Sequence, residues 1–71
     1  MNRDKILRKL ERTTENLENS LNYIQEVQEL VSRKTKSNKE IVTLYCEIEE
    51  ELVNLISKNN ELFELIEEEE E

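Results

Sequence analysis

Residues 32–39 have the sequence Ser32-Arg33-Lys34-Thr35-Lys36-Ser37-Asn38-Lys39, and these eight polar residues interrupt an otherwise regular apolar pattern. Two arrangements of the chain fit this interruption. One helix can continue through it, with a length of roughly 105 Å, or a turn can join two helices. Ser37 stands three residues before Glu40 and just ahead of an apolar pair, which is the capping-box pattern of a helix start. The segment therefore favours a turn.

Apolar residues recur every seven positions on both sides of this segment. One row consists of Leu10, Leu17, Ile24, Val31, Asn38, Tyr45, Leu52, Asn59 and Ile66. A second row lies four residues before each of these: Ile6, Thr13, Ser20, Val27, Lys34, Ile41, Ile48, Leu55 and Leu62. The chain also lacks Gly and Pro, so the commonest helix stops are missing. The long seven-residue repeat predicts α-helices that pack as a left-handed coiled coil.

The distribution of charge also favours two helices that fold back on each other. Residues 1–31 carry a net charge of −1, residues 32–39 carry +4 and residues 40–71 carry −11. Basic residues crowd the beginning of the chain and glutamates crowd its end, so folding back sets opposite charges side by side. Paired residue numbers then sum to about 72, which places Leu10 opposite Leu62 and Thr13 opposite Asn59.

We therefore predict an all-α fold, an antiparallel two-helix hairpin over residues 1–66. Its helices span about 3–33 and about 38–66, with a turn at about 34–38 and an acidic tail at 67–71. The expected hairpin seam consists of Ile6, Leu10, Leu17, Ile24, Val27, Val31, Ile41, Tyr45, Ile48, Leu52, Leu55, Leu62 and Ile66.

Further apolar residues lie beside this seam. Because two helices bury only one stripe of each, we expect partner helices to cover the rest and the isolated chain to be weakly cooperative or self-associated. The candidate partner-binding residues are Leu21, Tyr23, Leu30, Val42, Leu44, Cys46, Val53, Ile56, Phe63 and Leu65.

Composition limits the function. The chain has 71 residues, 4% of them aromatic, and it contains no His and a single Cys. We therefore expect no enclosed pocket, no catalysis, no cofactor or metal, and no small-molecule substrate. The net charge of −8 argues against direct binding of nucleic acid, and the absence of a long apolar run argues against a membrane span or signal peptide. An intracellular location is the expectation.

Three conspicuous features have ordinary structural interpretations. Cys46 stands among Glu47, Glu49 and Glu50, whose negative charges disfavour a reactive thiolate, so packing is the expected role of its side chain. The basic residues of the segment 32–39 suit a helix C-terminus and a solvated loop, with phosphate or acidic-protein binding as the alternative. We expect the terminal glutamates to fray, with electrostatic docking as the alternative.

The chain resembles the smallest Dad-type subunits of the fungal DASH complex, an outer-kinetochore assembly that couples chromosomes to spindle microtubules. The resemblance rests on Ile6-Leu7-Arg8-Lys9-Leu10, Asn16-Leu17 and Asn19-Ser20 in the first half, and on Leu44-Tyr45, Leu52-Val53 and Leu55-Ile56-Ser57-Lys58-Asn59-Asn60 in the second. The glutamate tail and the absence of Trp depart from that pattern. The resemblance implies a scaffold subunit of a heteromeric helical complex at the kinetochore and spindle in the nucleus.

Two other functions remain open. The chain can be a homo-oligomeric coiled-coil spacer, for which one continuous helix would be the sign. It can also be a SNARE-like tethering helix, although it shows no membrane anchor and its apolar stripe varies in width. Outside the kinetochore the expected location is the cytoplasm.

Overall fold

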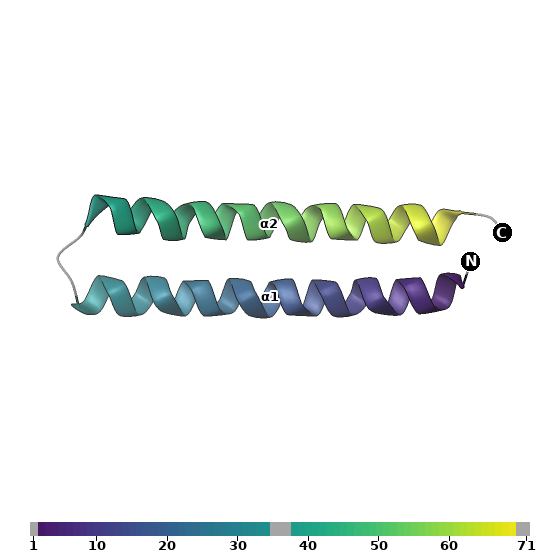
Figure 1. Ribbon diagram of the computed structural model, residues 1–71, viewed down its shortest axis with the longest axis horizontal. Helices are drawn as coiled ribbons and strands as arrows, with labels where there is room; N and C mark the ends of the chain where they lie inside the picture. Colours follow the sequence, from purple (N-terminus) through teal and green to yellow (C-terminus); the bar gives the residue numbers. More distant parts are fainter. Residues whose placement is uncertain (1, 35–37, 70–71) are drawn as a thin grey trace.

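The computed structural model describes residues 2–34 and 38–69, which form two long helices. Helix α1 spans Arg3–Lys34 and helix α2 spans Lys39–Glu68. The helices lie side by side and antiparallel, so that the start of α1 and the end of α2 lie at the same end of the molecule (Figure 1). The predicted all-α helical hairpin is thus confirmed, and a single continuous helix is not formed.

Both helices begin with an asparagine cap. The Asn2 side-chain Oδ1 accepts a hydrogen bond from the Lys5 backbone N–H at 3.2 Å. Asn38 has an extended backbone, and its Oδ1 accepts from the backbone N–H groups of Glu40 at 2.9 Å and Ile41 at 3.4 Å. Each cap satisfies backbone donors that have no partner within the helix.

The helix limits differ slightly from those expected. Helix α2 begins after the Asn38 cap, whereas the capping-box prediction assigned the cap to Ser37, which lies outside the described residues. Helix α2 also continues to Glu68, so the first two glutamates of the expected tail are helical. Residues 35–37 of the expected turn and residues 70–71 of the tail likewise lie outside the described part.

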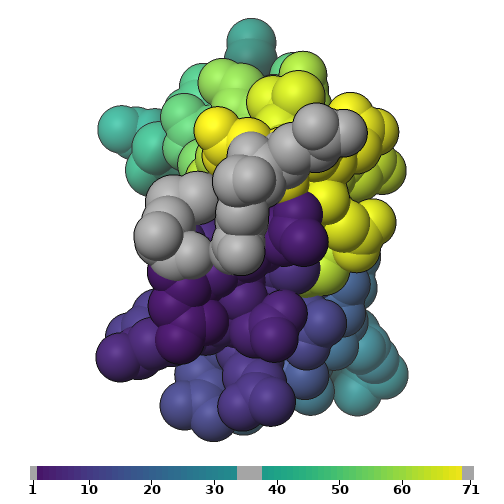
Figure 2. Space-filling view, turned by 90° about the vertical axis from the view of Figure 1, so that its right-hand side faces the viewer, coloured from purple at the N-terminus to yellow at the C-terminus, as the bar shows by residue number. Residues whose placement is uncertain are grey.

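The C-terminus of α2 is capped from the other helix. The last turn of α2 contains no basic residue, so its exposed carbonyl groups have no cation of their own nearby. The Arg3 Nη1 group of α1 donates hydrogen bonds to the backbone carbonyl of Glu67 at 3.3 Å and to that of Glu69. Figure 2 looks onto this end of the molecule, where the purple start of α1 lies directly against the yellow end of α2.

The hairpin is a thin rod that leaves much of its surface in water. It measures 56 × 15 × 12 Å, and none of the described residues is fully buried. Its accessible surface is 6070 Å², whereas a compact monomer of 8.6 kDa is expected to expose about 4700 Å². The two helices therefore form a seam between them but no enclosed core.

The Asn38 cap gives a test of helix α2. Asn38→Ala should lower the free energy of unfolding by about 0.5–2 kcal/mol, because the N–H groups of Glu40 and Ile41 lose their acceptor. Urea denaturation followed by circular dichroism measures this change. Asn54→Ala, on an exposed position within α2, is the control and should leave stability unchanged or slightly raised. An equal loss in both variants would contradict the assigned cap.

Candidate partner-binding face

The seam between the helices uses two heptad rows of each helix, and all of its members are half-buried. The α1 residues of the seam are Leu7, Leu10, Thr14, Leu17, Leu21, Ile24, Gln28 and Val31. The α2 residues are Val42, Tyr45, Glu49, Leu52, Ile56, Asn59, Phe63 and Ile66. Their spacing alternates between three and four residues along both helices, which is the pattern of coiled-coil packing.

The structure corrects one of the two rows predicted for this seam. The row from Leu10 to Ile66 is half-buried except for the Asn38 cap, which is exposed, and Ile6 is half-buried as well. The expected members Val27, Ile41, Ile48, Leu55 and Leu62 are exposed instead. Their places are taken by the residues that follow them in sequence, including three that were assigned to partner binding: Val42, Ile56 and Phe63. A fourth residue assigned to partner binding, Leu21, also lies on the half-buried seam.

Rotation of the helices explains this shift by one residue. The row from Leu10 to Ile66 can be paired with the row on either side of it, and one antiparallel partner covers only one of them. In α1, the observed rotation half-buries Leu7 and Leu21 and leaves Thr13 and Ser20 in water. In α2, it leaves the more apolar row exposed, and it places Glu49 on the seam.

A polar layer fixes the alignment of the two helices. The Asn59 side-chain amide donates to the Leu10 backbone carbonyl at 3.0 Å and to the Thr14 Oγ1 at 2.6 Å. Thr14 Oγ1 in turn donates to the same carbonyl at 3.2 Å. The sequence placed Asn59 opposite a threonine, but opposite Thr13 rather than Thr14. The sum of 14 and 59 agrees with the expected register of about 72, and heptad steps from this layer bring Leu7 to Ile66 and Leu21 to Leu52.

An apolar face lies outside this seam. Ten large apolar side chains of the described residues are exposed, and nine of them lie in the two heptad rows on one flank of the seam. We call these nine the exposed apolar face: Tyr23, Val27, Leu30, Ile41, Leu44, Ile48, Leu55, Leu62 and Leu65. In α2, the positions from Ile41 to Leu65 alternate in steps of three and four residues when Glu51 and Lys58 are included, so this helix carries a second heptad seam with two charged positions.

The α1 and α2 parts of this face lie on the same side of the hairpin. Antiparallel helices are related by an approximate two-fold axis perpendicular to the plane that contains both, so equivalent heptad positions share one side of it. The opposite flank shows this directly, because Glu11 and Asn60 occupy equivalent positions and line one open groove with Phe63. Val27 and Ile41 occupy equivalent positions of the other flank.

The opposite side of the hairpin is mainly polar. Its large exposed apolar residue is Val53, which lines an open groove with Cys46, Gln28 and Glu49. The thiol of Cys46 is free and exposed, so its side chain does not pack within the hairpin, and its expected packing against a partner helix stays a prediction. The remaining residues proposed for partner binding, Tyr23, Leu30, Leu44 and Leu65, are exposed and belong to the exposed apolar face.

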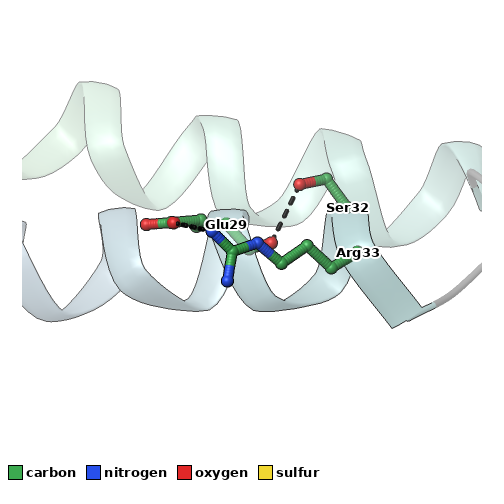
Figure 3. A network of polar contacts seen from close by, with 3 residues as sticks. All are labelled: Glu29, Ser32 and Arg33. Carbon is green, nitrogen blue, oxygen red and sulfur yellow. Dashed lines mark hydrogen bonds and ion pairs between the residues drawn. The ribbon is translucent and has the colours of Figure 1, made fainter.

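The polar contacts of the helix surfaces are local. Near the end of α1, the Arg33 Nη2 group contacts Glu29 Oε1 at 2.6 Å, and Ser32 Oγ donates to the Glu29 backbone carbonyl at 2.9 Å (Figure 3). An exposed pair of this kind adds about 0.3–0.5 kcal/mol to helix stability. At the other end of α1, Lys5, Arg8, Lys9 and Arg12 line a common groove and form no ion pair with other described residues. The expected attraction between the basic and acidic ends thus appears as the Arg3 cap rather than as ion pairs.

Comparisons with known proteins give no relative: no protein-family model, curated protein or solved structure matches the chain. Neither described helix combines the length and apolarity needed to cross a membrane. Within residues 2–34 and 38–69, no group of three or more Cys, Asp or Glu side chains is placed to hold a metal ion. The exposed apolar face is therefore the feature on which a functional interpretation rests.

A double-mutant cycle tests the polar layer. Thr14→Ala and Asn59→Ala should each destabilise the hairpin, and the double variant should lose less than the sum of both changes. The expected coupling is about 0.5–1.5 kcal/mol, the contribution of one partly buried hydrogen bond. Urea denaturation at one fixed protein concentration measures it.

Thr13→Ala provides the matched control for this cycle. Thr13 also donates to a backbone carbonyl four residues earlier, that of Lys9, at 2.9 Å, but it is exposed and does not contact Asn59. Its coupling to Asn59→Ala should be close to zero. Coupling of Asn59 to Thr13 as strong as that to Thr14 would show that the register differs from the one described.

Proposed function

We propose that this protein is a structural subunit of a helical complex, in which the hairpin supplies two helices of a bundle and other chains supply the rest. One observation carries this proposal: nine of the ten large apolar side chains that the described hairpin leaves in water lie on one face. Isolated apolar residues on a surface are ordinary, whereas a contiguous apolar stripe along two helices is typical of an interface.

The resemblance to Dad-type subunits supports a more specific version of this proposal. It favours a heteromeric complex at the outer kinetochore, in which the chain acts as scaffold and larger subunits contact the microtubule. The short, two-helix architecture is compatible with such a role. A homo-oligomeric coiled-coil module is the second candidate, because the exposed apolar face gives α2 a second heptad seam that another copy can cover.

The exposed apolar face allows folding and assembly to be separated experimentally. Leu55 is 49% exposed in the hairpin, so Leu55→Asp should leave the hairpin itself folded. In a complex, the same aspartate would be buried against apolar neighbours without a partner. Co-purification of the tagged chain from its native cells, followed by mass spectrometry, should therefore show loss of the partner subunits.

Val53→Asp is the matched control for Leu55→Asp. Val53 is 50% exposed on the same helix but lies on the opposite side of the hairpin. Its substitution should leave the complex intact. Leu52→Asp, on the half-buried seam, should instead unfold the hairpin, as circular dichroism of the purified variant would show. Equal loss of partners in the Val53 and Leu55 variants would contradict a role specific to the exposed apolar face.

Substitution of Cys46 tests whether the protein has a thiol-dependent activity. The thiol is exposed beside Val53 and outside the exposed apolar face, so Cys46→Ala should change neither the composition of the complex nor growth in a complementation assay. Cys46→Ser should behave in the same way. If either variant assembled normally but failed to complement, a thiol-dependent activity would replace the structural role proposed for this chain.

A further inference from the structure

The exposed apolar face sets three requirements for whatever covers it. The cover must extend along most of the molecule, because the face runs from Ile41 near the turn to Leu65 near the ends. It must offer apolar residues near the turn. It must also accommodate Glu51 and Lys58, which occupy two positions of the second heptad seam of α2.

The surface left in water is sufficient for a stable dimer. The hairpin exposes 6070 Å², which is about 1400 Å² more than expected for a compact monomer of its mass. Specific interfaces bury about 600–1000 Å² on each partner. Covering the exposed apolar face with one further hairpin would therefore remove a large part of this excess surface.

The same face of a second copy meets these requirements in one arrangement. If a two-fold axis runs along the rod between two stacked hairpins, α2 of each copy lies antiparallel to α1 of the other. Heptad positions of the two copies then pair where their residue numbers sum to 71. Inside each hairpin, the paired numbers of Thr14 and Asn59 sum to 73, so the two registers differ by one residue per helix.

This register matches side chains of similar character in six of its eight layers. Four layers are apolar on both sides and two are polar on both sides. The layers are Ile41 with Leu30, Leu44 with Val27, Ile48 with Tyr23, Glu51 with Ser20, Leu55 with Asn16, Lys58 with Thr13, Leu62 with Lys9 and Leu65 with Ile6. The hydroxyl of Ser20 can donate to the Glu51 carboxylate, and that of Thr13 can accept from the Lys58 ammonium.

The apolar layers are concentrated where the inner seam is weakest. Near the turn, the inner seam includes the polar residues Gln28 and Glu49. The exposed apolar face holds Tyr23, Val27 and Leu30 in the corresponding part of α1. Three consecutive apolar layers of the paired arrangement would therefore cover the part of the hairpin that its own seam stabilises least.

Charge selects this arrangement over the alternative in which α2 packs on α2 of the second copy. Residues 40–71 carry twelve acidic residues and one basic residue, so two such helices in contact would repel. With the two-fold axis along the rod, the α2 helices lie diagonally apart. The acidic end of each α2 instead lies beside the basic start of α1 on the second copy, where Lys9 is on the paired face and Lys5 and Arg12 flank it. These basic residues form no ion pair within the described hairpin.

We propose that two copies pair through the exposed apolar face into an antiparallel four-helix bundle, with α2 of each copy against α1 of the other. This inference rests on the structural role proposed above and names the occupant of the face. In this dimer, each copy covers the exposed apolar face of the other. The dimer is then the unit that enters any larger complex.

Sedimentation equilibrium of the full chain over a concentration series tests the pairing. The mass should approach twice 8.6 kDa as concentration rises. Ile48→Asp should weaken the dimer by about 100-fold or more, because each dimer would bury two unpaired carboxylates. Ile48 is 42% exposed in the hairpin, so the variant keeps its helix content at high concentration. Val53→Asp, on the opposite side, should dimerise like the unsubstituted chain.

Thiol cross-linking tests the orientation of the two copies in a Cys46→Ala background. A tagged Tyr23→Cys variant mixed with an untagged Ile48→Cys variant should be joined by a short bismaleimide, because Tyr23 of one copy faces Ile48 of the other. Tyr23→Cys mixed with Val53→Cys should give little product. Preferential joining of Ile48→Cys to itself would overturn the orientation.

A monomeric mass at every concentration, or a dimer insensitive to Ile48→Asp, would overturn the pairing. Native mass spectrometry of the co-purified complex separates this result from failure of the proposed function. A complex that holds one copy and is lost on Leu55→Asp would retain the structural role and remove the dimer.

Discussion

The number of seams that two helices can form limits the whole structure. Each helix of the hairpin has one neighbouring helix, and it can bury only one apolar stripe against that neighbour. The row from Leu10 to Ile66 is used in any arrangement, but the rows on its two flanks compete for the inside. Once Leu7 and Phe63 turn inward, Ile41, Ile48, Leu55 and Leu62 face water. The half-buried seam and the exposed apolar face are therefore consequences of one rotation.

Polar contacts fix how the helices meet, while apolar contacts hold them together. The amide of Asn59 uses both of its hydrogens on α1, at the Leu10 carbonyl and at Thr14 Oγ1. An asparagine on a coiled-coil seam lowers stability but selects one register, because other registers leave its amide without partners. Arg3 supports the same alignment at the open end, where it supplies donors that the glutamate-rich last turn of α2 lacks.

The proposed role as a structural subunit follows from what the hairpin leaves unfinished. A rod of 56 × 15 × 12 Å with no fully buried described residue has few means to stabilise itself alone. Its exposed apolar residues are concentrated on one side and its acidic residues on one helix, so the surface distinguishes between orientations of a partner. A second copy satisfies both features when α2 lies on α1, and the resemblance to kinetochore subunits extends the proposal to larger assemblies.

Heptad periodicity, the polar residues 32–39 and the opposed charges along the chain were enough to predict two helices and their antiparallel register. The sequence also identified one seam row. Of the nine residues of the exposed apolar face, it assigned four to partner binding and the other five to the seam. Two choices needed the packed hairpin: Thr14 rather than Thr13 is the neighbour of Asn59, and the Val42 row rather than the Ile41 row lies inside. Both choices depend on how far each helix is rotated about its own axis, because a small rotation replaces one row by the row one residue later. The packing of the two helices against each other sets this rotation. Seven-residue spacing is the same for either row, so periodicity carries no information on which row lies inside.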